Sequence, residues 1–152
     1  MKWTGSAALR SRAFWAGGAL GIAIGLAGFF FGAVPMSGTA AEPAGRSVTP
    51  VFEEELSNLP GYSLAAVVVD YAPGGHSASH RHAGPVFAYV LEGQVRSKLD
   101  DGPAVVYQGG ESFFEPLGTH HVISENASGT ESAKLLAVFV AQDGATLTTF
   151  DE

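Results

Sequence analysis

The sequence predicts an all-β domain, an antiparallel sandwich or barrel, over residues 51–152. Short apolar or alternating runs recur about every ten residues, and glycine, proline or aspartate separates each run from the next. No helical period follows residue 42, except one turn near 52–59. A segment of about 100 residues can bury a core, so a single small domain is expected.

The position of the turn residues predicts where each strand begins and ends. A valine-rich run lies between Pro60-Gly61 and the turn at 73–75. In the run 94–99, apolar or small residues alternate with Arg96 and Lys98, as in a strand with one solvated face. The expected strands, in order, are 62–71, 86–91, 94–99, 104–107, 112–115, 121–124, 133–140 and 145–150.

The large apolar side chains of these runs are the candidates for the core. Tyr89 and Tyr107 could offer phenol groups to an internal cavity, but aromatic core filling is the preferred interpretation for both. Residues 53–55 are all glutamate and are expected to form a solvated acidic face. A barrel of this size has a narrow interior, so only a small ligand would fit. The expected core residues are Phe87, Tyr89, Leu91, Phe113, Leu135, Val138 and Val140.

Residues 1–41 have the pattern of a secretory signal peptide or of an N-terminal transmembrane anchor. Three basic residues precede an uncharged, largely apolar stretch over 13–41. About 20 apolar residues suffice to cross a bilayer, whereas the small residues at 37–41 would suit signal peptidase, so both alternatives stay open. The basic flank keeps that end in the cytoplasm, so the domain is expected to be extracytoplasmic, periplasmic or secreted, after a linker at 42–50.

The charge of the remaining chain excludes one large class of partners. Residues from Glu42 onward hold all 15 acidic residues but only five of the eight basic ones. Such a surface repels phosphate backbones, so no nucleic acid is expected as a partner, and membrane contact would depend on the N-terminal segment. The chain has no cysteine, which excludes disulfides and thiolate metal ligands.

Four of the five histidines fall in two short clusters. His80 and His82 would point to the same face of an extended strand, so both imidazoles can converge on one point. His120 and His121 are neighbours, and only one of them can enter the barrel. Three imidazoles leave positions for water or substrate on a divalent metal, as in catalytic sites. The alternative is a pair of surface-loop histidines.

Two longer patterns contain these histidines. The first, G-x5-H-x-H-x3,4-E-x6-G, is matched at Gly74, His80, His82 and Gly93. The second, G-x5-P-x-G-x2-H-x3-N, is matched at Gly110, Pro116, Gly118 and His121, with Asn126 displaced by one residue. With both motifs in order, the chain resembles the cupin superfamily, particularly its small single-domain bacterial members. The resemblance implies a cupin-type double-stranded β-helix, a jelly-roll barrel, with metal ligands at His80, His82 and His121.

One departure from the first motif concerns its glutamate ligand, which would fall at Val86 or Phe87. Some dioxygenases of the superfamily use three histidines alone. Alternatively, Glu115 could supply the missing carboxylate or act as a general base. The preferred interpretation makes Glu115 a solvated acid at a strand end. Loss of a carboxylate leaves a more positive site, which favours anionic ligands.

Two further histidines are given lesser roles. His76 lies in a glycine-rich loop and is expected at the mouth of the barrel. His120 is expected to point outward or to support a ligand from behind.

The resemblance leaves the function open between classes. One hypothesis is a dioxygenase-like metal enzyme acting on a small organic acid, diketone or phenol, with iron(II) preferred over manganese, nickel, zinc and copper. The second is a non-catalytic module that binds or senses a small ligand. A third is a metal-free sugar isomerase-type cupin with histidine as the base. A homodimer through exposed edge strands is also conceivable on this pattern.

Overall fold

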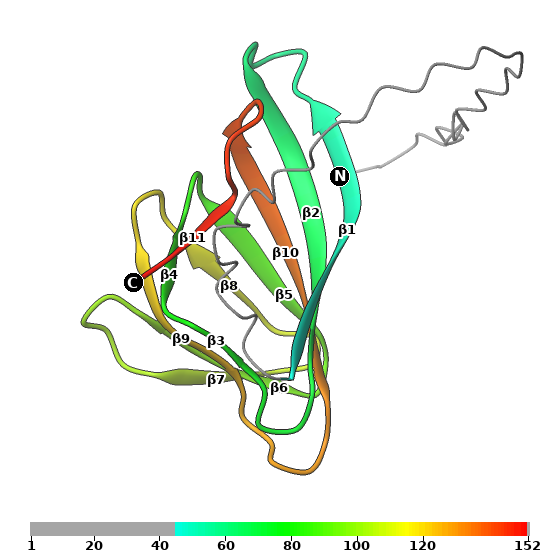
Figure 1. Cartoon of the computed structure of the whole chain (residues 1–152), viewed down its shortest axis with the longest axis vertical. Coiled ribbons are helices and arrows are strands. Elements are labelled where there is room, and N and C mark those ends of the chain that lie inside the picture. Colours follow the sequence, from blue (N-terminus) through cyan, green and yellow to red (C-terminus); the bar gives the residue numbers. More distant parts are fainter. Residues whose placement is uncertain (1–44, 152) are drawn as a thin grey trace, which may run out of the picture. The chain divides into compact units, whose positions relative to one another are not determined.

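The computed structural model describes residues 45–151, and within them every regular element is a β-strand. Figure 1 shows two groups of strands that face each other. The strands are β1 (Arg46–Glu55), β2 (Tyr62–Tyr71), β3 (His76–Ser77), β4 (His80–His82), β5 (Val86–Glu92), β6 (Gln94–Leu99), β7 (Val105–Gln108), β8 (Ser112–Glu115), β9 (His120–Asn126), β10 (Ala133–Gln142) and β11 (Thr148–Phe150).

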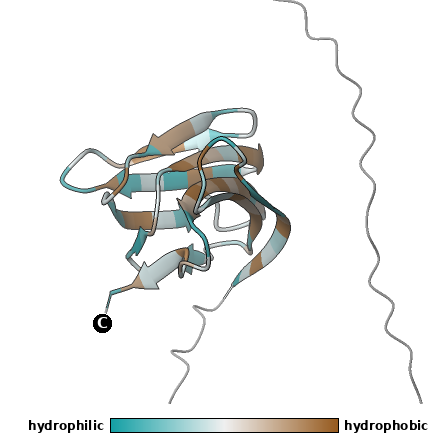
Figure 2. Cartoon of the chain, turned by 90° about the horizontal axis from the view of Figure 1, so that it is seen from above, coloured by the Kyte–Doolittle hydropathy of each residue, from teal (hydrophilic) through white to brown (hydrophobic). Residues whose placement is uncertain are grey.

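The strands form two antiparallel sheets. The first has the order β1-β2-β10-β5-β8. The second has the order β11-β4-β9-β6-β7, and β3 also pairs with β9. Hydrophobic segments lie along the strands, and the loops are mostly hydrophilic (Figure 2). The predicted all-β fold class is therefore confirmed.

The predicted strand 62–71 coincides with β2, and 112–115 coincides with β8. The start of the domain differs from the expectation, because β1 covers residues 46–55, where the sequence suggested a linker and then a helical turn. β1 pairs with β2 from Arg46 opposite Tyr71 to Glu55 opposite Ser63. The register shifts between Pro50 and Phe52, and a proline is tolerated on an edge strand because its missing N–H removes no bond from a neighbour.

The core lies between the two sheets, and it differs from the expected one in the phase of β5. Val86, Ala88 and Val90 are fully buried. Phe87, Tyr89 and Leu91, which were expected in the core, point outward and keep 45%, 36% and 39% of their surface exposed. Both faces of β5 are apolar, so alternation alone did not reveal which face is inside.

The other expected core residues behave in two ways. Phe113 and Leu135 are buried as predicted. Val138 and Val140 are only half-buried, whereas Ala137 and Phe139 fill the interior on the same strand. The glutamates at 53–55 are exposed as predicted.

The predicted signal or anchor at 1–41 lies outside the described residues. Within residues 45–151, no helix has the length and hydrophobicity needed to span a membrane.

Candidate metal centre

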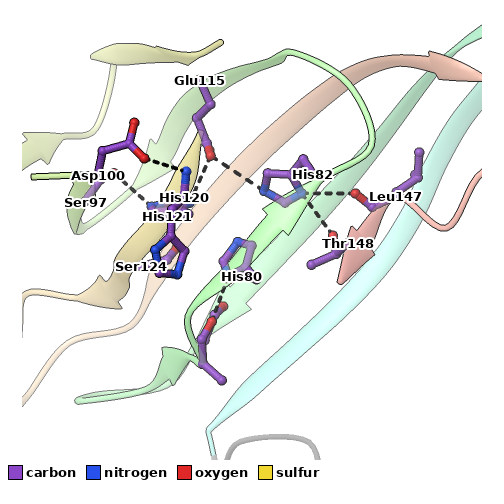
Figure 3. A network of polar contacts seen from close by, with 12 residues as sticks. His80, His82, Ser97, Asp100, Glu115, His120, His121, Ser124, Leu147 and Thr148 are labelled. Carbon is purple, nitrogen blue, oxygen red and sulfur yellow. Dashed lines mark hydrogen bonds and ion pairs between the residues drawn. The ribbon is translucent and has the colours of Figure 1, made fainter. Parts of the chain in front are cut away.

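Two strands of the second sheet bring three histidines together. β4 carries His80 and His82, and β9 carries His121 directly opposite His80 in the ladder. One nitrogen from each ring lies within 4.8 Å of the other two (Figure 3). His80 and His121 are 5% and 2% exposed, and His82 is half-buried. The predicted convergence of these three imidazoles is therefore present.

Hydrogen bonds orient the two rings of β4. The Nδ1 of His80 lies 2.7 Å from the carbonyl oxygen of Ala78. The Nδ1 of His82 lies 3.1 Å from the carbonyl oxygen of Leu147 and 3.1 Å from Oγ1 of Thr148 (Figure 3). Because a carbonyl accepts, each Nδ1 carries the proton and each Nε2 keeps a free lone pair. Such bonds fix ring direction in metal sites.

The imidazole of His121 is held through its Nε2, whereas the rings of His80 and His82 are held through Nδ1. Its Nε2 lies 2.9 Å from Oγ of Ser97, on the neighbouring strand β6. The Nδ1 of His121 is buried and has no hydrogen-bond partner among residues 45–151. This nitrogen is the one that faces Glu115, whose Oε2 lies 3.2 Å away.

Burial keeps the rings of β4 neutral. Removal from water lowers the pKa of His80 to about 4, although the bond to Ala78 partly opposes this shift. Burial also lowers the pKa of His82, while nearby Glu115 opposes it. A neutral imidazole is the form that binds a metal, so both rings are ready to ligate at neutral pH.

Glu115 lies beside the three imidazoles, and the expectation of a solvated acid was wrong. The residue is 3% exposed and points into the barrel from β8. Its Oε2 lies 3.2 Å from Nδ1 of His121 and 3.7 Å from Nε2 of His82 (Figure 3). Neither contact is aligned as a hydrogen bond, and this oxygen has no hydrogen-bond partner among the described residues.

The residues fit a divalent first-row metal. Atoms that bind one ion at about 2.1 Å each stand at most about 4.2 Å apart. The imidazole nitrogens lie within 4.8 Å of each other, so on binding the widest pair would close by about 0.6 Å to stand opposite each other on the ion, or by up to about 1.8 Å to stand as neighbours roughly 3.0 Å apart. Imidazole and carboxylate donors suit iron, manganese, nickel, copper and zinc. The two buried atoms without partners, on His121 and Glu115, also suggest a ligand between them.

The centre lines one side of a cavity of about 240 Å³. The opposite wall is mainly apolar and comes from β2 and β10, which contribute Val67, Val69, Leu135, Ala137 and Phe139. The volume agrees with the expected narrow interior, so only a small ligand fits beside the imidazoles.

Sequence reasoning missed several polar residues of this cavity, of which Tyr71 and Arg46 are the largest. Tyr71 is 2% exposed, and its hydroxyl lies 2.8 Å from Oγ of Ser77 and 2.9 Å from Oγ of Ser124. The sequence does contain a signal for Tyr71. It follows Val67 and Val69 at two-residue spacing on β2, which places all three side chains on the same face. Arg46 donates to Ser77 at 3.1 Å. The proline, glycine and serine around Arg46 are typical of a linker, so the sequence carries no local signal that this residue begins β1.

The remaining aromatic and histidine candidates lie away from the cavity. His120 faces the surface, where its Nε2 is 2.6 Å from Oδ2 of Asp151. His76 is exposed on β3 and does not line the cavity. Tyr107 stacks on Phe113 with ring centroids 4.7 Å apart, as expected of core filling.

Known proteins resemble this chain in sequence and fold. The family model for the cupin domain matches residues 67–139. Germin-like protein subfamily 2 member 2 of Arabidopsis thaliana is 30% identical over 122 residues, which cover 75% of this chain and 53% of that protein. The chain thus spans about half the length of the curated relatives it matches.

Two solved structures illustrate the shared fold. A cupin-like protein from Thermotoga maritima has a TM-score of 0.59 at 17% identity and covers 76% of this chain and 84% of its own. An oxalate oxidase in complex with the substrate analogue glycolate has a TM-score of 0.55 at 24% identity, and the match covers 80% of this chain and 62% of that one. Both agree with a double-stranded β-helix.

Proposed function

Because the chain belongs to the cupin superfamily, we propose that it is a mononuclear metal-dependent enzyme, of dioxygenase-like kind, acting on a small organic acid, diketone or phenol. The observation that carries this proposal is the convergence of three inward imidazoles on the wall of a small internal cavity. His80, His82 and His121 would hold the metal. When bound there, a divalent metal supplies Lewis acidity, and iron(II), our preferred ion, also supplies redox activity.

The cavity supports an anionic substrate. Arg46 places a cationic side chain on the cavity lining, and it is directly opposite Tyr71 in the β1–β2 ladder. The opposite wall is mainly apolar, and apolar surroundings strengthen the attraction between a guanidinium and a carboxylate or enolate. The oxalate oxidase with a similar fold was solved with a small hydroxy acid, glycolate. Among the three substrate classes, we therefore favour a small organic acid.

Metal analysis tests the site. Full-length protein purified without an affinity tag of histidines should hold one equivalent of metal, and His82→Ala should abolish it. His76→Ala is the matched control, because His76 is exposed and outside the cavity. Equal loss in both variants would show that the ligand assignment is wrong.

Turnover is tested separately from metal binding. Iron-loaded protein should consume oxygen with one member of a panel of small acids, diketones and phenols. The second candidate function, a binding or sensing module, is favoured by one observation, the Val86 at the position of the motif glutamate. If no compound is consumed but one of them raises the melting temperature, the module replaces the enzyme.

We propose that the domain works outside the cytoplasm, released or anchored by residues 1–41. The support is the basic flank followed by the apolar stretch in the sequence. Protease added to intact cells or spheroplasts should cleave the domain. Protection of the domain until lysis would reject this localisation.

We further propose a homodimer through the outer face of the first sheet, rather than through edge strands. A row of directly paired residues crosses all five strands without a charge, and Phe87 and Phe114 in it are 45% and 58% exposed. Two copies, each with a formal charge of −7, meet with least repulsion along this uncharged row. The row consists of Phe114, Phe87, Val138, Ala66 and Phe52.

Sedimentation velocity tests the dimer. Phe87→Glu should shift the protein to a monomer, whereas Val105→Glu, at an exposed position of β7 in the second sheet, should leave the dimer intact. A Phe87→Glu protein that still sediments as a dimer would reject this face.

A further inference from the structure

We propose that Glu115 is a fourth metal ligand, so that the carboxylate missing from the first motif is supplied across the sheet by β8. This inference rests on the three-histidine site proposed above. It concerns a variable position inside the second motif, because Glu115 directly precedes Pro116 and the motif requires no acid there.

The strand register explains how the carboxylate can change strands. The motif glutamate would fall at Val86 or Phe87, and Val86, the buried one of the two, is directly opposite Glu115 in the β5–β8 ladder. Residues that face each other in an antiparallel ladder point to the same side of the sheet, with Cβ atoms about 5 Å apart. Val86 is fully buried and Glu115 is 3% exposed, so both point into the barrel. A carboxylate on either strand therefore reaches the same interior region.

The distances agree with coordination to one ion. Two atoms bound at about 2.1 Å stand roughly 3.0 Å apart at an octahedral edge and roughly 3.4 Å apart at a tetrahedral edge. The Oε2 of Glu115 lies 3.2 Å from Nδ1 of His121 and 3.7 Å from Nε2 of His82. The carboxylate thus stands to two imidazoles much as neighbouring ligands stand to each other.

The contact with His121 is not an ordinary hydrogen bond. Although 3.2 Å separates the two atoms, both are buried and neither has a hydrogen-bond partner among residues 45–151. A buried carboxylate oxygen without a partner costs several kcal/mol unless a positive group compensates it. A cation in contact with Glu115, His82 and His121 would satisfy both orphan atoms at once.

The test measures cobalt(II) affinity and the visible spectrum of the cobalt-loaded full-length protein. We expect Glu115→Gln to weaken affinity at least about tenfold and to change the spectrum, because a charged ligand is lost. Glu131→Gln is the matched control, since Glu131 is exposed in the loop before β10 and should leave both readouts unchanged. Melting curves in EDTA establish that each variant folds.

A second variant moves the carboxylate back across the ladder. The exchange Val86→Glu with Glu115→Val should recover most of the affinity, because the new carboxylate points to the same interior region. An exchange variant that folds but binds no better than Glu115→Gln would overturn the proposal. So would wild-type affinity and spectrum in Glu115→Gln, even if turnover falls, because Glu115 would then act on substrate. Loss of metal in His82→Ala alongside that result keeps the histidine site and rejects only this inference.

Discussion

Acidification should destabilise the metal-free protein through His80. The ring is buried beside His82 and His121, and burial lowers its pKa from the ordinary 6.5 to about 4. Between these two values the unfolded chain holds a proton on this residue and the folded chain does not. Stability is therefore fully present above about pH 6.5 and falls as the pH drops toward 4, because protons favour the unfolded state.

The size of the effect follows from the two pKa values. The folded and unfolded pKa values differ by about 2.5 units. At about 1.4 kcal/mol for each unit, the free energy of unfolding can fall by at most roughly 3 kcal/mol, which is reached well below pH 4. At about pH 4.5, where the folded ring is still largely neutral, the loss is about 2.5 kcal/mol. For a small domain this is a large part of the total stability.

Urea unfolding in EDTA at several values between about pH 7.5 and pH 4.5 measures the effect. Carboxylates also titrate near the lower end, so the informative quantity is the difference between wild type and His80→Gln. Glutamine can still donate to the carbonyl oxygen of Ala78 but does not titrate. The wild-type free energy of unfolding should fall by about 2.5 kcal/mol more than that of the variant. Parallel curves would refute the reasoning.

Three further substitutions test hydrogen bonds and packing inside the barrel by chemical denaturation. Tyr71→Phe removes the hydroxyl between Ser77 and Ser124 and should cost about 1–3 kcal/mol; no loss would mean that these bonds add nothing. Asn126→Ala removes three hydrogen bonds to backbone groups from a buried side chain and should cost about 2–4 kcal/mol, with a cost below about 1 kcal/mol arguing against that role. Gly84→Ala would place a Cβ 1.9 Å from a backbone oxygen of β10 and should cost about 1–3 kcal/mol, so an unchanged midpoint would contradict that packing.

The strand pattern was readable from the sequence because turn residues are local signals. Gly61 and Gly93 both adopt positive φ angles, of 83° and 70°, directly before β2 and β6. Glycine is favoured there whatever the rest of the chain does. The beginning of β1 was not readable in this way, because its residues become a strand only through pairing with β2.

The direction of the β5 side chains could not be read from the sequence. Phe87, Tyr89 and Leu91 are larger than Val86 and Val90, so size favoured the wrong face for the core. The choice depends on the space between the sheets, where small side chains leave room for a cavity beside the histidines. That space is a property of the whole barrel.

By itself, the sequence determined the approximate position of most strands from β2 onward and the shared direction of His80 and His82, because turn signals and the two-residue period of a strand act over short distances. Only the tertiary structure decided that Glu115 is buried opposite Val86 and that Arg46 and Tyr71 line the cavity. These placements depend on which distant strands pair and in which register, and a one-residue change of register would turn each side chain to the other face.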